Sequence, residues 1–194
     1  MSLIKQIRGS WFSGIYKATI LPRARKKAKL LKPMLNPKSK ILEIGSGNCG
    51  LAYLLQKDFH SVTATDIVDC SFFNSIKPTV FNGEALPFKS KSFDYVLIIT
   101  VLHHTTKQLS LLNEAKRLGN EVIVMEDLYT NKFGQRILHF TDSLVNLEFK
   151  GHPHTNRTDA GWRVVFKRLN LKITDTVKLR TLFFFRQIIY MLRS

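Results

Sequence analysis

Acidic residues are missing from the first 42 positions of this 194-residue chain. That stretch holds eleven of the 30 lysines and arginines, whereas the rest has 19 basic residues against 14 acidic ones. The net charge of +16 is therefore concentrated at one end. We interpret residues 1–38 as a basic, helical N-terminal segment, and residues 39–194 as a separate and more evenly charged domain.

Cysteine is scarce and long apolar runs are absent. Cys49 and Cys70 are too few for a disulfide framework or a zinc site, which favours a reducing, cytoplasmic compartment. No run of 18 or more uncharged apolar residues occurs, so we expect no membrane-spanning helix, and the start lacks a signal-peptide pattern. A hydrophobic content of 44% suits one globular domain of this length.

Beyond residue 40, short apolar runs alternate with helical patterns. We expect strands at residues 41–44, 61–66, 78–81, 93–100, 121–126, 171–179 and 185–192. We expect helices at residues 52–57, at residues 107–118 with Gly119-Asn120 as their stop, and from Thr155 or Thr158 to about Leu169. This alternation predicts an α/β fold with a doubly wound parallel sheet.

Ligands of such sheets bind beyond the carboxyl ends of the strands. Candidate binding residues should therefore come from the segments that follow the expected strands, which are residues 45–50, 66–67, 82–84, 100–104 and 126–129.

The first of these segments is a glycine-rich turn, in I-L-E-I-G-S-G-N-C-G (41–50). Its glycines have the spacing of a dinucleotide-binding fingerprint. Glu43 argues against NAD, because its carboxylate lies close to the turn and would repel a pyrophosphate. S-adenosylmethionine carries the same adenosine, but with a sulfonium and an ammonium, and a nearby carboxylate favours both cations. The turn therefore favours S-adenosylmethionine as the cofactor.

The next strand ends in Asp66, whose carboxylate can accept two hydrogen bonds from a ribose diol. The predicted cofactor-binding residues, taken from the strand ends, are Glu43, Gly45, Ser46, Gly47, Asp66, Ile67, Asn82, Gly83, Glu84 and Thr100.

Four stretches carry a resemblance to a known family. E-I-G-S-G-N-C-G (43–50) resembles the first motif of class I S-adenosylmethionine-dependent methyltransferases, and V-T-A-T-D (62–66) resembles their second-strand acidic motif. Residues 81–96 and I-T-V-L-H-H-T (99–105) resemble regions of the small-molecule branch called type 11. The resemblance is strong over residues 39–126.

This resemblance implies a Rossmann-like sheet of mostly parallel strands, seven in all, with the last strand antiparallel and helices on both faces. It implies methyl transfer from S-adenosylmethionine. It also places Asn82 where the family usually has an acidic residue that meets the adenine amino group. The Asn/Asp-Pro-Pro-aromatic tetrad of enzymes that methylate exocyclic amines of nucleic-acid bases is absent, which lowers the expectation of that activity.

Histidine is the side chain best suited to accept a proton from a methyl acceptor near neutral pH. We predict catalytic roles for His104, after the fourth strand, and for His152 and His154 in G-H-P-H-T-N (151–156). His103 is adjacent to His104, so its side chain should point in a different direction, and we expect a structural role for it. Residues 127–155 form a long insertion that is suited to be a lid or an acceptor wall. The histidine spacing matches no metal site, so we expect no metal.

The N-terminal segment has an apolar repeat of helical spacing, followed by the basic run R-A-R-K-K-A-K (23–29). Three interpretations remain open: a helix that covers the cofactor cleft, a helix that lies on an anionic membrane with Trp11 and Phe12 as anchors, or an RNA-binding arm. We favour a covering helix whose basic continuation touches an anionic or membrane-borne substrate. We also expect the domain to keep its fold without residues 1–38.

The function that these expectations favour is methyl transfer to an oxygen or nitrogen of a small or lipid-like acceptor. Two alternatives are an RNA methyltransferase guided by the basic segment and a catalytically silent cofactor-binding subunit. We expect a cytoplasmic protein, which can associate peripherally with a membrane if its acceptor is lipid-like.

Overall fold

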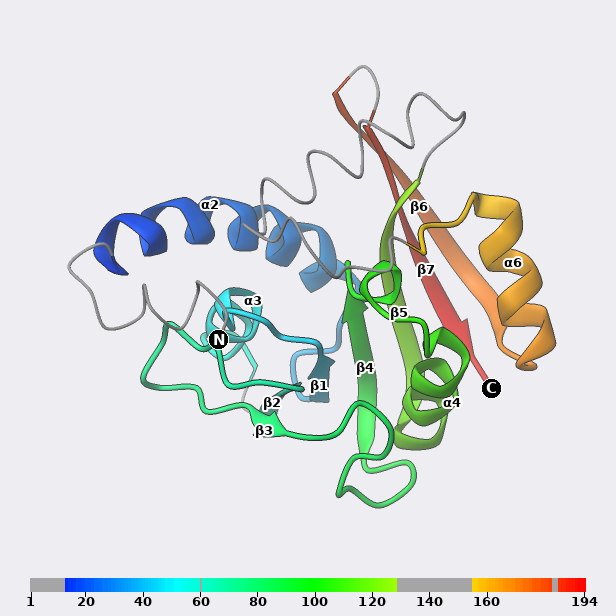
Figure 1. Ribbon diagram of the computed structural model, residues 1–194, viewed down its shortest axis with the longest axis horizontal. Coiled ribbons are helices and arrows are strands. Elements are labelled where there is room, and N and C mark those ends of the chain that lie inside the picture. Colours follow the sequence, from blue (N-terminus) through cyan, green and yellow to red (C-terminus); the bar gives the residue numbers. More distant parts are fainter. Residues whose placement is uncertain (1–12, 60, 129–154, 183–184) are drawn as a thin grey trace.

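A single twisted sheet organises the chain in the computed structural model, which describes residues 13–59, 61–128, 155–182 and 185–194 (Figure 1). The strands are β1 (Lys40–Ile44), β2 (Ser61–Asp66), β3 (Thr79–Val80), β4 (Phe93–Ile99), β5 (Gly119–Leu128), β6 (Lys172–Leu182) and β7 (Phe185–Arg193). The helices are α2 (Ser13–Leu31), α3 (Gly50–Leu55), α4 (Gln108–Leu118) and α6 (Asp159–Arg168), with short 3₁₀ turns η1 (Lys32–Met34) and η2 (Leu102–His104).

The strand order is β3-β2-β1-β4-β5-β7-β6 in a sheet of 7 strands. Strands β1 to β5 pair in parallel, whereas β7 runs antiparallel to both of its neighbours, β5 and β6. This confirms the expected doubly wound sheet with an antiparallel last strand. The order reverses at β1, where the next strand in the chain lies on one side and β4 on the other, so a ligand crevice is expected there.

Strand residues alternate between two cores, because successive side chains of a strand point to opposite faces. Leu42 and Ile98 pack on the face that α4 and α6 cover, and Ile41 and Leu97 pack on the face that α2 and α3 cover (Figure 1). Since helices cover both faces, the central strand β4 is apolar almost throughout, as a buried parallel strand should be.

Two local expectations can be compared with the structure. Helix α4 ends at Leu118 with Gly119 as its C-cap, as expected, and Gly119 also pairs with Phe93 as the first residue of β5. A glycine is required there, since a Cβ would lie 2.6 Å from Cγ2 of Val96. Of the two possible caps of α6, Thr158 is the cap, and its hydroxyl accepts a hydrogen bond from the amide of Gly161 at 3.1 Å.

Helix α2 is built into the domain. Ala24, Ala28 and Leu31 are buried with side chains of α3 and of β1, including Ile41. Loss of α2 would expose this core, so we expect the helix to contribute to the stability of the domain, and the boundary at residue 38 stays a prediction. None of the described helices is both long and apolar enough to cross a bilayer.

Candidate functional site

A cavity of about 660 Å³ opens at the carboxyl edge of the sheet, beside the point where the strand order reverses. This volume lies within the usual range for ligand pockets. The sheet edge contributes residues 43–48, 66–68, 99–101 and 104–105. Helix α2 contributes Tyr16, Thr19, Ile20, Arg23, Ala24 and Lys27. The helix therefore lines the cavity, as the first part of the favoured interpretation expected, whereas contact between its basic residues and an acceptor stays a prediction.

The glycine-rich turn forms one wall. Gly45 has φ +74°, and a Cβ there would lie 2.6 Å and 2.7 Å from the two methyl groups of Val101. Gly47 also has a positive φ, of +51°, but no atom lies within 4 Å of the position of its Cβ. Thus packing and conformation both require glycine at position 45, whereas only conformation favours it at position 47.

Asp66 closes this turn from the end of β2. Its Oδ2 accepts a hydrogen bond from the amide of Gly47 at 2.6 Å, and its Oδ1 accepts one from the amide of Ile67 at 2.7 Å. Burial raises the pKa of the Asp66 carboxyl, and these backbone hydrogen bonds oppose the rise. The carboxylate therefore shapes the loop and lines the cavity at the same time.

Glu43 is the most perturbed acid of the cavity. Its side chain is only 4% exposed, and burial raises its pKa to about 8 despite the opposing charge of Lys27 and a hydrogen bond from the backbone of Ala52. Within the described part of the chain, its Oε2 has no hydrogen-bond partner. A buried, unpaired carboxylate oxygen carries a desolvation cost, and a cationic ligand would remove that cost. Its chemistry fits the ammonium of S-adenosylmethionine.

Lys27 of α2 also lines the cavity. Its Nζ donates a hydrogen bond to Oγ1 of Thr100 at 2.8 Å. Desolvation lowers the pKa of this ammonium, and the acidic side chains of Asp127, Glu43 and Glu126 oppose the effect. The residues of the basic run 23–29 do not share one environment. Arg23 and Lys27 line the cavity, whereas Arg25, Lys26 and Lys29 are exposed and do not line it.

Thr100 adopts a strained conformation where β4 ends. Its φ is +58°, which is rare for a β-branched residue. Its amide donates to the carbonyl of Met125 at 2.7 Å, and its hydroxyl donates to the carbonyl of Ile99 at 2.6 Å. Such strain persists only where the surroundings impose it, and it is often found at functional sites.

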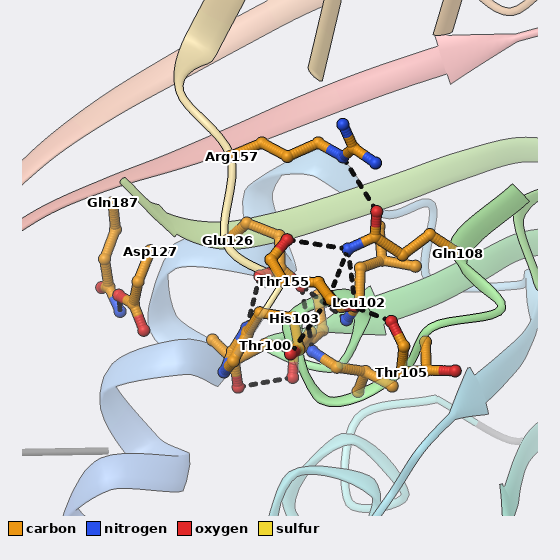
Figure 2. A network of polar contacts seen from close by, with 12 residues as sticks. Thr100, Leu102, His103, Thr105, Gln108, Glu126, Asp127, Thr155, Arg157 and Gln187 are labelled. Carbon is orange, nitrogen blue, oxygen red and sulfur yellow. Dashed lines mark hydrogen bonds and ion pairs between the residues drawn. The ribbon is translucent and has the colours of Figure 1, made fainter. Parts of the chain in front are cut away.

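Glu126, at the end of β5, holds the turn η2 in place (Figure 2). Its Oε1 accepts hydrogen bonds from the amides of Val101 at 3.0 Å and Leu102 at 2.8 Å, and its Oε2 lies 2.5 Å from Nδ1 of His103. His103 is only 2% exposed. Its neighbour His104 lies with its ring centre 4.0 Å away and lines the cavity.

The chain returns to this turn after the predicted insertion (Figure 2). The amide of Thr155 donates to the carbonyl of His103 at 3.0 Å, and Gln108 Nε2 donates to the carbonyls of Thr155 at 3.0 Å and Leu102 at 2.9 Å. Strand β5 ends at Leu128, at the same edge of the sheet. His152, His154 and most of the insertion lie outside the described residues.

The cavity brings most of the predicted residues together, namely Glu43, Gly45, Ser46, Gly47, Asp66, Ile67, Gly83, Thr100 and His104. Asn82 and Glu84 are not among the residues that line it. The side chain of Asn82 accepts a hydrogen bond from the amide of Glu84 at 3.0 Å, and Glu84 pairs with Lys107 at 2.5 Å. Of this segment Gly83 lines the cavity, and cofactor contacts of Asn82 and Glu84 stay a prediction.

Sequence comparisons agree with this geometry. Residues 42–121 match the sequence model of the family described as Methyltransferase domain. An uncharacterized protein of Methanocaldococcus jannaschii is 35% identical over 95 residues, which cover 45% of this chain and 44% of that protein. The chain therefore spans less than half the length of this relative.

Structural comparisons extend the likeness to the whole chain. A Haloferax volcanii protein in complex with the Trm112 methyltransferase activator has a TM-score of 0.73 at 11% identity, over 100% of this chain and 99% of its own. Magnesium protoporphyrin IX methyltransferase from Synechocystis, with bound S-adenosylhomocysteine, has a TM-score of 0.63 at 17% identity, over 92% and 84%. Geranyl diphosphate C-methyltransferase from Streptomyces coelicolor has a TM-score of 0.67 at 12% identity, over 87% and 80%. At these identities the likeness is one of fold.

Proposed function

We propose that this chain is a class I S-adenosylmethionine-dependent methyltransferase and that it transfers a methyl group to an oxygen or nitrogen of a small or lipid-like acceptor. The observation that carries the proposal is the buried carboxyl of Glu43, a residue that lines a cavity of ligand size beside the glycine turn and whose Oε2 has no hydrogen-bond partner among the described residues. When bound, the cofactor supplies a methyl group on a positively charged sulfur.

The residues of this chain would hold the cofactor in three places. Asp66 would accept hydrogen bonds from the ribose hydroxyls, and the turn from Gly45 to Gly47 would let the backbone approach the ligand. Glu43 would bind the ammonium of the methionine part. This division follows the positions of the three groups around one cavity.

On the acceptor side, His104 would take the proton that an acceptor hydroxyl or ammonium loses. The support is its position on the cavity wall and the buried His103–Glu126 contact, which fixes the turn that carries it. We also propose that His152 and His154 belong to an acceptor wall. The support is the anchoring of the insertion beside this turn, at Leu128 on one side and Thr155 on the other.

The acceptor class is supported by the compounds that two structural neighbours are named for, a diphosphate ester of an isoprenoid and a porphyrin. Arg23, an exposed basic residue of α2 that lines the cavity, would meet an anionic or membrane-borne acceptor. The alternative is an RNA acceptor whose phosphates would contact the exposed basic residues of α2.

Calorimetric titration tests the cofactor step. S-adenosylhomocysteine should bind the wild-type chain, NADH should bind far more weakly, and Glu43→Gln should weaken S-adenosylhomocysteine binding. Tighter binding of NADH would overturn the cofactor assignment. A tritiated-methyl assay over lipid, RNA and protein fractions of a cell extract then tests the acceptor class. Label in the RNA fraction alone would replace the small-molecule proposal with the RNA alternative.

A further inference from the structure

We propose that Lys27 binds the α-carboxylate of S-adenosylmethionine, so that helix α2 is a working part of the cofactor site. The inference rests on the proposed function, because it assumes that this cofactor occupies the cavity. It assigns a role to a residue that its sequence context, a run of surface lysines and arginines, does not single out.

The position of Lys27 is the first support. It lines the same cavity as Glu43 and Asp66, although it lies on a helix that precedes the whole sheet. Its Nζ donates to the hydroxyl of Thr100, an uncharged group that also donates to the carbonyl of Ile99. An ammonium has three N–H donors, so it can keep this hydrogen bond and also bind a carboxylate.

Charge complementarity is the second support. The methionine part of the cofactor carries an ammonium and a carboxylate on one carbon, so its site needs an anion and a cation that are close together. Glu43 and Lys27 supply them, and each shifts the pKa of the other through its charge. Both groups lose hydration in the cavity, and a zwitterion placed between them would compensate both losses.

A purely structural role for Lys27 is the competing explanation. In that case its charge only offsets the nearby carboxylates of Glu43, Asp127 and Glu126. The two explanations differ in what they predict for ligands. A structural lysine affects folding and all ligands alike, whereas a carboxylate-binding lysine discriminates between ligands with and without that group.

Decarboxylated S-adenosylmethionine separates the two, because it keeps the adenosine, the sulfonium and the ammonium. Hydrogen bonds to charged groups contribute about 1.5–3 kcal/mol, which is about 10- to 150-fold in affinity. The wild-type chain should therefore bind S-adenosylmethionine about 10- to 150-fold more tightly than the decarboxylated compound. Lys27→Met should lose most of this preference, by weakening S-adenosylmethionine binding and leaving the decarboxylated compound nearly unaffected.

Three variants control the measurement. Lys26→Met removes an exposed charge at the next position of the same helix and should leave the preference unchanged. Lys27→Arg keeps the cation and should keep a large part of the preference. Glu43→Gln should weaken both compounds to a similar extent, because both carry the ammonium.

The outcomes separate this inference from the function on which it rests. If the wild-type chain binds neither compound, the cofactor assignment itself fails. If it binds both equally, or if Lys27→Met weakens both equally, the cofactor assignment stands and the role of Lys27 is wrong. If Lys27→Met does not fold, Lys27→Gln replaces it. Its preference for S-adenosylmethionine over the decarboxylated compound is then compared with those of the wild-type chain and Lys27→Arg by the same criteria.

Discussion

Replacement of Glu43 with glutamine should weaken cofactor binding, and its effect on stability should shift in favour of the variant as the pH rises. The physical reason is the pKa of about 8, which burial produces from an ordinary value of 4.5. A carboxyl with a raised pKa in the folded state keeps its proton more tightly there than in the unfolded chain. Its contribution to stability is therefore greatest below pH 4.5 and is lost as the pH rises towards 8.

The size of the effect follows from the shift. Each unit of pKa corresponds to about 1.4 kcal/mol, so the full difference gives an upper limit of about 5 kcal/mol. Between pH 5.5 and 8 the loss should be about 3 kcal/mol. The charge of Lys27 and the nearby carboxylate of Asp66 act on the same group in opposite directions, so the effect belongs to this cluster.

Urea denaturation of the wild-type chain and of Glu43→Gln, at several pH values between 5.5 and 8, measures the effect. Every other titrating group is common to both proteins, so the difference between their free energies of unfolding isolates position 43. That difference should shift in favour of the variant as the pH rises.

Calorimetry at pH 8 should show weaker binding of S-adenosylhomocysteine by the same variant. The pH-independent part of the difference in free energy of unfolding includes any change in packing or hydrogen bonding, so only the pH-dependent part tests the argument. A difference that stays flat across the pH range would refute the burial argument. Unchanged ligand affinity would refute the role of Glu43 in binding.

Other substitutions test the remaining walls of the site. Gly45→Ala should destabilise the protein by about 2–4 kcal/mol, because it adds overpacking against Val101 to an unfavourable φ, whereas Gly47→Ala should cost only about 1 kcal/mol; equal losses in thermal denaturation would contradict this. Asp66→Ala should weaken S-adenosylhomocysteine binding by about 2–3 kcal/mol in calorimetry, the scale of hydrogen bonds to a charged group, and unchanged affinity would sink the ribose assignment. His104→Ala should lower single-turnover methyl transfer about a hundredfold or more while cofactor affinity stays nearly the same; a normal rate would exclude His104 as the base.

Local patterns were enough to predict the sheet and its ligand edge. A short apolar run bounded by turn residues, such as residues 93–100, has few alternatives to a buried parallel strand, and β4 occupies nearly that range. The glycine turn with Glu43 and the acidic end of β2 could be predicted for the same reason. Their chemistry is contained in a few consecutive residues at strand ends, and the parallel sheet brings those ends together.

The sequence alone determined, then, the strands, the glycine turn and the acidic groups beside it. Only the tertiary structure decided which cation faces them, because the hydrogen bond from Lys27 to Thr100 joins residues 73 positions apart. Which basic residues of α2 line the cavity, here Arg23 and Lys27, depends on the face that the helix packs against the domain, and the buried Ala24, Ala28 and Leu31 set that face. Likewise, Glu84 forms an ion pair with Lys107, a residue that is distant in sequence. Charge composition gives the number of such residues but not the direction in which each side chain points, because long-range packing sets that direction.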